Sequence, residues 1–327
     1  MPKVMIAVDG LFEVHGRYVE MLREAGFEVV YAPKPVLSSE EETIKAFQGV
    51  SATIAGGEPY SERVLRSLTE LRVISRWGVG VDRIDLQAAT RQKIAVAITP
   101  TANHEAVAEH TVTMLLALTR FLVQRDYQVR QGLWERYPSL SLRGKKLGLV
   151  GLGRIGRSVA VRVAAFRPEI LACESFPDQD FLQAYEIKLL DLETLLSQSD
   201  FVSLHIPLTE ETRGLMNRDT LSCMKRGSFL INTARGELVV EEDLMALLES
   251  GHIAGCALDV FEQEPHGKNY PLLKFDNVIM TPHTAGVDEQ SIEDMAVEAA
   301  ENIINLYRDT WPRGSVVNSD LRPHWKW

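Results

Sequence analysis

The sequence predicts an α/β protein made of two doubly wound parallel-sheet domains. The chain has 327 residues, more than one domain usually contains and enough for two separate cores. Short apolar runs of strand type alternate with helical stretches twice along the chain, first up to residue 99 and again from residue 147 onward. Such alternation is typical of parallel sheets whose strands are joined by helices.

The first series of strands and helices fills residues 1–99. Strands are predicted at the runs KVMIAVD, FEVVYA, SATIAG and LRVISR. Between them, helices are expected around Tyr18–Glu24, around Glu41–Phe47 and near Leu65. Because each strand is followed by a helix, these strands are expected to lie parallel in one sheet.

The second domain is expected to open with one long helix. After Thr99-Pro100, apolar residues recur at helical spacing from His104 to about Gln131. Six further strands are then predicted at LGLVGLG, EILACE, DFVSLHIP, GSFLINT, IAGCALDVF and NVIMTPH. A last helix is expected over Asp288–Asp309, before Pro312. The expected domains are residues 1–99 plus 287–327, and residues 100–286.

Composition and charge exclude several classes of protein. Hydrophobic residues make up 45% and charged residues 24%, as in an ordinary globular chain. The net charge is -10 without a run of Lys or Arg, which argues against a nucleic-acid or membrane partner. No segment resembles a signal peptide or the roughly 18–20 apolar residues that cross a bilayer. Cys173, Cys223 and Cys256 are widely spaced, which favours reduced thiols in a cytoplasmic protein over disulfides or a metal site.

The strongest local motif is LGLVGLGRIG. An apolar strand, Leu147–Val150, runs directly into Gly151, Gly153 and Gly156 and then into a helical stretch. In a dinucleotide-binding fold these glycines allow a tight turn, close approach of the pyrophosphate, and packing of helix on strand. The phosphates then lie at the helix N-terminus, where main-chain N–H groups are free.

The acidic residue of this fingerprint is Glu174. It ends the next strand, EILACE, 18 residues beyond Gly156, where a carboxylate can accept hydrogen bonds from the ribose hydroxyls. The residues that follow, Ser175, Phe176 and Pro177, supply no arginine for a 2′-phosphate. NAD is therefore predicted as the cofactor in preference to NADP.

Arg235, Glu264 and His283 each follow a predicted strand of this same domain. Parallel sheets bind ligands at the carboxyl ends of their strands, so these side chains are expected to lie near the cofactor. Oxidising an alcohol beside a carboxylate needs a base, which His283 can supply, and a planar cation, which Arg235 can supply. Glu264 would orient the imidazolium and favour its acid form near neutrality.

Several motifs together resemble those of the D-isomer-specific 2-hydroxyacid dehydrogenase family. They are RWGVGVDRIDL, VAEHTVTMLLAL, DFVSLHIPLTEETRGLMN, FLINTARGELV, ALDVFEQEP and MTPHTAG, and the resemblance spans nearly the whole chain. It implies a Rossmann NAD domain inserted in a flavodoxin-like substrate domain, with the active site in the cleft between them. It also implies a small D-2-hydroxy or 2-keto acid substrate, and a homodimer joined through the long helix.

The resemblance further implies roles for individual residues in catalysis, cofactor binding and substrate binding. Catalysis would fall to Arg235, Glu264 and His283. The cofactor contacts would be Arg154 and Ile155 with pyrophosphate, Pro207 and Thr212 near adenosine, Thr233 and Ala234 beside nicotinamide, and Asp259 with the carboxamide. The substrate contacts would be Arg76 and the main chain of Val79 and Gly80.

Departures from the family pattern leave the substrate open. Arg83 stands where the family usually has asparagine, and its role is open. Phosphoglycerate is not favoured, because Gly56 and Gly57 stand where phosphoglycerate dehydrogenases tend to carry a basic residue and no regulatory domain is seen. Phosphite and formate are less favoured, since related enzymes have lysine near Val79 or glutamine at Glu264. The alternative to an enzyme is an NAD-responsive corepressor-like binding protein.

Overall fold

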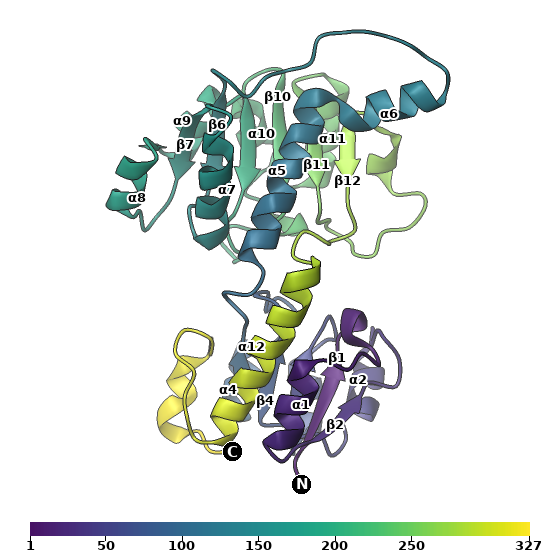
Figure 1. Cartoon of the computed structure of the whole chain (residues 1–327), viewed down its shortest axis with the longest axis vertical. Helices are drawn as coiled ribbons and strands as arrows, with labels where there is room; N and C mark the ends of the chain where they lie inside the picture. Colours follow the sequence, from purple (N-terminus) through teal and green to yellow (C-terminus); the bar gives the residue numbers. More distant parts are fainter. The chain divides into compact units, whose positions relative to one another are not determined.

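The computed structural model describes all 327 residues and divides the chain into two compact units (Figure 1). Unit 1 comprises Met1–Asn103 and Val287–Trp327, so the C-terminal segment belongs with the N-terminal strands. Unit 2 comprises His104–Gly286. Each unit contains one parallel sheet with helices on both faces, which confirms the predicted fold class.

The sheet of unit 1 has five parallel strands in the order β2-β1-β3-β4-β5. This is the flavodoxin-like order, in which the chain changes direction between β1 and β3. The strands are β1 (Lys3–Ala7), β2 (Glu28–Tyr31), β3 (Ala52–Ala55), β4 (Val73–Arg76) and β5 (Ala95–Ala97). The first four were expected, whereas β5 was not, because three residues are too few to show a strand pattern.

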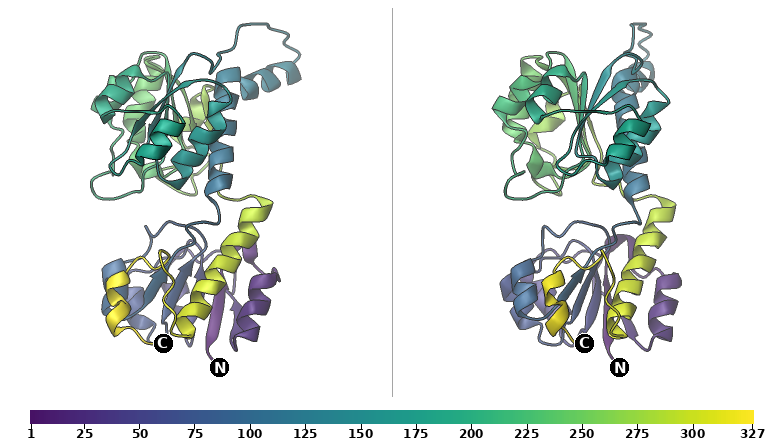
Figure 2. Two further views of the ribbon diagram at one scale, coloured as in Figure 1. Left: turned by 60° about the vertical axis from the view of Figure 1, so that its left-hand side comes forward. Right: turned by 90° about the vertical axis from the view of Figure 1, so that its left-hand side faces the viewer.

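Helices cover both faces of this sheet (Figure 2). On one face lie α1 (Arg17–Glu24) and α12 (Glu289–Tyr307), which pack on each other and, through α12, on β3 and β4. On the other lie α2 (Glu40–Ala46), α3 (Glu62–Ser67) and α4 (Leu86–Arg91). Two short 3-10 helices, η1 (Asp9–Leu11) and η4 (Ser319–His324), complete the unit. Alternate residues of β1 enter the two cores, because successive strand side chains point to opposite faces.

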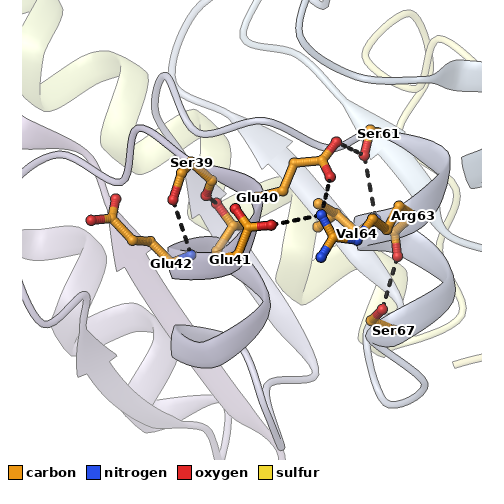
Figure 3. Close-up of polar contacts among 9 residues, drawn as sticks. Ser39, Glu40, Glu41, Glu42, Ser61, Arg63, Val64 and Ser67 are labelled. Carbon is orange, nitrogen blue, oxygen red and sulfur yellow. Dashed lines mark hydrogen bonds and ion pairs between the residues drawn. The ribbon is translucent and has the colours of Figure 1, made fainter.

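Serine side chains cap α2 and α3, and Arg63 joins the two helices (Figure 3). Ser39 and Ser61 each accept a hydrogen bond from a main-chain N–H in the first turn of their helix. Arg63 donates to both Glu40 and Glu41, at 2.9 and 2.7 Å. Because these charges are largely exposed, each ion pair contributes only about 0–1 kcal/mol.

The sheet of unit 2 has seven parallel strands in the order β12-β11-β10-β9-β6-β7-β8. Six of them repeat the Rossmann order, and β12 extends the sheet at one edge. The strands are β6 (Lys146–Val150), β7 (Glu169–Cys173), β8 (Lys188–Leu189), β9 (Phe201–Leu204), β10 (Ser228–Asn232), β11 (Ile253–Leu258) and β12 (Val278–Met280). Only β8 was not expected, because it has two residues and both are exposed.

The helices of unit 2 also form two layers. One face of the sheet packs on α5 (His104–Arg120), α7 (Arg154–Ala164) and α8 (Gln179–Ala184). The other packs on α9 (Leu192–Gln198), α10 (Arg218–Cys223) and α11 (Glu241–Glu249). The 3-10 helix η2 (Gly236–Leu238) follows β10, and the 3-10 helix η3 (Pro271–Lys274) precedes β12.

The prediction of one helix from His104 to about Gln131 is wrong. The chain forms α5 and then α6 (Leu122–Arg130), bent by 59° at Phe121, whose φ of 52° is left-handed and ends α5. Packing also stops stabilising the helix at this point, because α5 buries an apolar stripe whereas α6 buries no residue. No single helix is apolar and long enough to cross a membrane, and only this bent pair meets the length and composition test.

Candidate active site

The glycine loop joins β6 to α7 and is shaped by main-chain packing. Gly151 has φ of 96°, and a Cβ there would lie 2.7 Å from the carbonyl oxygen of His205. A Cβ on Gly156 would lie 2.3 Å from the carbonyl oxygen of Gly151. At Gly153 a Cβ would meet no atom within 4 Å, so open space lies directly before α7. The first and third glycines thus serve packing, and the second leaves room for a ligand.

This open space suits a pyrophosphate. Gly153 is the N-cap of α7 and provides no side chain to satisfy the N–H groups of the first turn, where Arg154 and Ile155 lie. Free N–H groups and the positive end of the helix dipole favour an anion at this place. The residues present therefore fit the predicted dinucleotide.

Glu174 lies directly beside this loop. Its two carboxylate oxygens accept hydrogen bonds from the N–H of Leu152 at 2.7 Å and of Phe176 at 2.9 Å. Each oxygen keeps a further lone pair, so the carboxylate can still accept from ribose hydroxyls. The structure thus brings the two halves of the predicted fingerprint together.

An arginine that sequence reasoning missed also reaches this region. Arg157, on α7, donates from Nε to the carbonyl oxygen of Leu152 at 3.0 Å and from Nη1 to Asp178 at 2.8 Å. The sequence shows no arginine directly after Glu174, but the fold supplies one from another element. No local sequence pattern predicts the contact, because Asp178, the partner of Arg157, lies 21 residues further along the chain.

Pro207 and Thr212 lie together in the loop after β9. The Thr212 hydroxyl donates to the carbonyl oxygen of Pro207 at 2.8 Å and accepts from the N–H of Thr209 at 2.8 Å. Because β9 is the neighbour of β6, this loop leaves the sheet next to the glycine loop. The predicted contact of both residues with adenosine stays a prediction.

His283 and Glu264 form a hydrogen-bonded pair. Nδ1 of His283 lies 2.6 Å from Oε2 of Glu264, while Oε1 accepts from the N–H of Phe261 at 2.8 Å. The His283 side chain is 50% exposed, and the ring nitrogen Nε2 is left available to a substrate. The residue has φ of 54°, a left-handed conformation that histidine adopts more readily than branched residues.

Electrostatics keep Glu264 ionised. Its burial alone would raise the pKa of this carboxyl, but its hydrogen bond to His283 and the His283 charge lower it. The N–H of Phe261 and the positive charge of Arg235 act in the same direction, so the pKa of Glu264 is lowered overall. An ionised carboxylate at this position can hold an imidazolium in one orientation.

Arg235 is packed against the segment that carries Glu264. It follows β10, its main-chain carbonyl accepts from Asn232 at 2.8 Å, and its Nη1 donates to the carbonyl oxygen of Ala234 at 2.6 Å. The next residue is Gly236, where a Cβ would lie only 2.0 Å from the carbonyl carbon of Phe261. The main chains of the segments that carry Arg235 and Glu264 are therefore in direct contact.

Asp259 organises the turn that carries His283. The carboxylate is fully buried and accepts from the Thr281 hydroxyl at 2.5 Å and from the N–H groups of Thr284 at 2.9 Å and Ala285 at 2.8 Å. The N–H of His283 also donates to the main-chain oxygen of Asp259 at 2.8 Å. Its predicted contact with the carboxamide stays a prediction, and the observed contacts add a structural role.

Helix α5 contributes two further side chains that the sequence did not single out. Nε2 of His110 lies 3.0 Å from the Thr281 hydroxyl, and the hydroxyl of Thr111 lies 2.8 Å from that of Thr233. The N–H of Ala234 donates to Asn232 at 3.0 Å, which fixes the start of the segment leading to Arg235. In the sequence, only the presence of polar residues on a mostly apolar helix could have indicated these contacts of α5.

The loop after β4 in unit 1 holds the remaining predicted residues. Arg76 donates from Nε to the carbonyl oxygen of Gly80 at 2.8 Å and from Nη1 to that of Ala55 at 3.2 Å. Gly78 has φ of 126°, and its N–H donates to the Thr99 hydroxyl at 2.8 Å. These contacts shape the loop, while the predicted binding of substrate by Arg76, by the exposed Val79 and by the half-buried Gly80 stays a prediction.

The neighbouring loop after β3 is fixed by a buried carboxyl group. Glu58 accepts from the N–H of Gly56 at 2.9 Å and from the Tyr60 hydroxyl at 2.6 Å, and burial raises its pKa. Arg83 reaches this loop from outside, donating from Nη1 to the carbonyl oxygen of Gly57 at 3.2 Å. The residue whose role the sequence left open therefore places a positive charge beside Gly57.

Comparisons with known proteins agree with this geometry. The family model for the D-isomer specific 2-hydroxyacid dehydrogenase, NAD binding domain, matches residues 112–285. A glyoxylate reductase of Thermofilum pendens is 40% identical over 311 residues, covering 93% of this chain and 91% of that enzyme. A D-3-phosphoglycerate dehydrogenase of Archaeoglobus fulgidus is 35% identical over 308 residues, and the match spans 93% of this chain but 58% of that enzyme.

A solved structure extends the match to the whole fold. The TT0316 protein from Thermus thermophilus is 35% identical, with a TM-score of 0.85 over 96% of this chain and 100% of that one. Sequence, fold and the glycine loop therefore lead to the same assignment. The chain belongs to the D-isomer specific 2-hydroxyacid dehydrogenase family, and it is an NAD-dependent oxidoreductase that interconverts small 2-hydroxy and 2-keto acids.

Proposed function

We propose that the enzyme reduces a small 2-keto acid, with glyoxylate as the first candidate, and that Arg235, Glu264 and His283 carry the reaction. The observation that supports this most is the 2.6 Å pair between His283 and Glu264, with the charge of Arg235 acting on the same carboxyl group. The glycine loop would hold NAD, which in its reduced form would supply the hydride.

In this proposal His283 delivers the proton. Nδ1–H donates to Glu264, which leaves Nε2–H to protonate the keto oxygen as it becomes a hydroxyl. In the reverse direction the same nitrogen takes the hydroxyl proton. Glu264 stabilises the protonated ring and keeps its plane fixed through both directions.

Arg235 polarises the carbonyl group. A guanidinium presents parallel N–H donors that match a carboxylate and the adjacent keto oxygen, and it stabilises the negative charge that grows there. We assign the main-chain N–H groups of Val79 and Gly80 to the substrate carboxylate as well. Arg76 supports them by holding the Gly80 carbonyl at 2.8 Å.

Two observations bear on the substrate. Glyoxylate is favoured because the 40% identity to a glyoxylate reductase covers nearly the full length of both chains. A specific contact keeps 3-phosphohydroxypyruvate as the second candidate, since Arg83 places a cation beside Gly57. Gly57 itself leaves open space, because a Cβ added there would meet no atom within 4 Å.

The test is NADH oxidation by purified protein with glyoxylate, hydroxypyruvate, pyruvate and 3-phosphohydroxypyruvate, with NADPH as the control. We expect clear turnover of glyoxylate with NADH. Arg83→Ala should spare glyoxylate, whereas selective loss of 3-phosphohydroxypyruvate turnover would favour the second candidate. Tight NADH binding with no turnover of any substrate would instead support a corepressor-like binding protein.

We also propose a homodimer that uses α6 and the segment after it. Six large apolar side chains there are 48–73% exposed. They are Leu122, Val123, Tyr127, Val129, Leu133 and Trp134. A cluster of this kind is typical of a surface that is covered by a partner. Sedimentation of the protein should give twice the chain mass, and Tyr127→Ser combined with Trp134→Ser should shift it toward the monomer; a monomeric wild type would refute the dimer.

A cytoplasmic location is the third part of the proposal. All three cysteines are unpaired, as expected for a chain kept in a reducing compartment. Cell fractionation with an antibody to the protein would test it, and recovery outside the cytoplasmic fraction would contradict it.

A further inference from the structure

One residue of the glycine loop, Leu152, is held by side chains at both of its main-chain polar groups. Leu152 lies between Gly151 and Gly153, the two glycines next to the predicted pyrophosphate position. Its N–H donates to the Glu174 carboxylate at 2.7 Å, and its carbonyl oxygen accepts from Nε of Arg157 at 3.0 Å. Main-chain groups of a loop are more often bound to other main chain, so two side chains on one residue call for an explanation.

Arg157 is itself fixed by contacts outside the loop. Its Nη1 donates to Oδ2 of Asp178 at 2.8 Å, and its guanidinium carbon lies 5.3 Å from the centre of the Phe181 ring. The other oxygen of Asp178 caps α8 by accepting from the N–H of Phe181 at 3.2 Å. That N–H and the positive charge of Arg157 lower the pKa of Asp178 below its ordinary value. The arginine therefore has one defined direction toward Leu152.

These contacts connect two loops at two points. Residues 174–178 follow β7, and both ends of this segment bind the main chain of Leu152. Glu174 binds its N–H directly, and Asp178 binds its carbonyl through Arg157. The main-chain conformation at Leu152 thus sets the position of the ribose carboxylate relative to the phosphate loop.

The glycines explain why such a restraint matters. A residue without Cβ can adopt many main-chain conformations, so Gly151 and Gly153 alone do not define which way the two peptide groups beside Leu152 point. Ordering a loop on binding reduces affinity, and a loop already held in its bound form avoids that loss. A side chain that fixes the main chain at Leu152 before binding should strengthen binding without touching the ligand.

We propose that Arg157 is a positioning residue for NAD. Anchored by Asp178, it holds the carbonyl group of Leu152 so that the glycine loop and Glu174 are already placed for the pyrophosphate and the adenosine ribose. The proposal rests on the cofactor residues assigned above, and it adds Arg157 and Asp178 to them as residues that act through Leu152 and Glu174.

The test compares Arg157→Met, Arg157→Lys and Asp178→Asn with Arg162→Met. Arg162 is the matched control, because it lies on the same helix and loses its ion pair with Glu105 without contact to the glycine loop. Dissociation constants are measured by fluorescence titration with NADH and by calorimetry with ADP-ribose. Nicotinamide mononucleotide, which lacks the adenosine half, is the control ligand.

We expect Arg157→Met to weaken NADH and ADP-ribose by about tenfold, and Arg157→Lys and Asp178→Asn by less. Affinity for nicotinamide mononucleotide should fall less than affinity for NADH, because this ligand lacks the adenosine ribose that Glu174 binds, and kcat at saturating NADH should not fall. Arg162→Met should bind all three ligands like the wild type. A purely structural role would instead lower the melting temperature of Arg157→Met and leave the ligand affinities equal to those of Arg162→Met.

Equal NADH affinity in Arg157→Met and Arg162→Met would overturn the proposal. If Arg157→Met does not fold, unchanged NADH affinity in both Arg157→Lys and Asp178→Asn would overturn it equally. The outcome is separate from that of the proposed function, because binding is measured without a keto acid. A wild type that binds NADH but turns over no substrate would refute the catalytic assignment and leave this test intact.

Discussion

Replacing Gly236 by alanine should separate Arg235 from the Glu264 segment. A Cβ at Gly236 would lie 2.0 Å from the carbonyl carbon of Phe261, 2.1 Å from its oxygen and 2.5 Å from the nitrogen of Glu262. Ordinary contacts begin at 3.4 Å, so the two main chains must move apart by roughly 1.4 Å. Neither side can yield by turning a side chain, since all three atoms belong to the main chain.

The size of the effect follows from that displacement. A misplacement of about 1 Å at a catalytic group can reduce the rate about 100-fold, which corresponds to about 2.7 kcal/mol of lost transition-state stabilisation. We therefore expect Gly236→Ala to lower kcat/KM for the keto acid by about 100-fold or more. NADH binding should change far less, because the glycine loop lies on other strands of the sheet.

The assay is steady-state NADH oxidation together with NADH titration of the same preparation. Gly267→Ala is the matched control, because it follows Glu264 closely, a Cβ there meets no atom within 4 Å, and its φ is not left-handed. Retention of NADH binding shows that the variant is folded. Wild-type kcat/KM in a folded Gly236→Ala variant would refute the idea that main-chain contact between the two segments sets the catalytic geometry.

Three further predictions concern single side chains. Glu264→Gln should lower kcat by about 100-fold. Because the pKa of Glu264 is lowered from 4.5, the ionised carboxylate stabilises the fold at neutral pH, and this stabilisation is lost as the pH falls below 4.5. In urea unfolding, the free energies of unfolding of the wild type and Glu264→Gln should therefore converge in acid. Burial lowers the pKa of His205 from 6.5 to about 4. Between pH 6.5 and pH 4 the folded protein therefore binds fewer protons than the unfolded protein. The free energy of unfolding should therefore decrease as the pH is lowered from 6.5 to 4, by about 3 kcal/mol at most because His205 is only partly buried. In urea unfolding, His205→Gln should remove this dependence of stability on pH. An unchanged pH dependence in the variant would contradict the prediction. Glu174→Ala should raise the Kd for NADH by about tenfold, because the ribose loses its acceptor and Leu152 loses its partner; unchanged affinity would refute the role.

The parts of the site that sequence could predict are local in the chain. The strand, the three glycines and the following helix lie within residues 146–164, so their spacing alone carries the physical constraint. Arg235 and His283 could be selected because each comes directly after a strand, and parallel strands end at one edge of the sheet. Glu264, too, follows a strand of that edge.

The parts that sequence could not predict depend on distant partners. Arg157 meets Asp178 only because α7 and the loop after β7 are brought together by the sheet. The buried carboxylate of Asp259 binds the turn of His283, a contact that no spacing in the sequence reveals, while its contact with the carboxamide stays a prediction. The break at Phe121 was missed because apolar spacing continues past it, whereas the buried stripe does not.

The central claim is that His283 transfers the proton, and its most direct test is the turnover of His283→Asn. Asparagine tolerates the left-handed φ of 54° at this position, so the turn should survive the change. We predict that NADH binds with wild-type affinity while kcat with glyoxylate falls by about 100-fold or more. A variant that keeps wild-type kcat would contradict the assignment of His283 and, with it, the proposed mechanism.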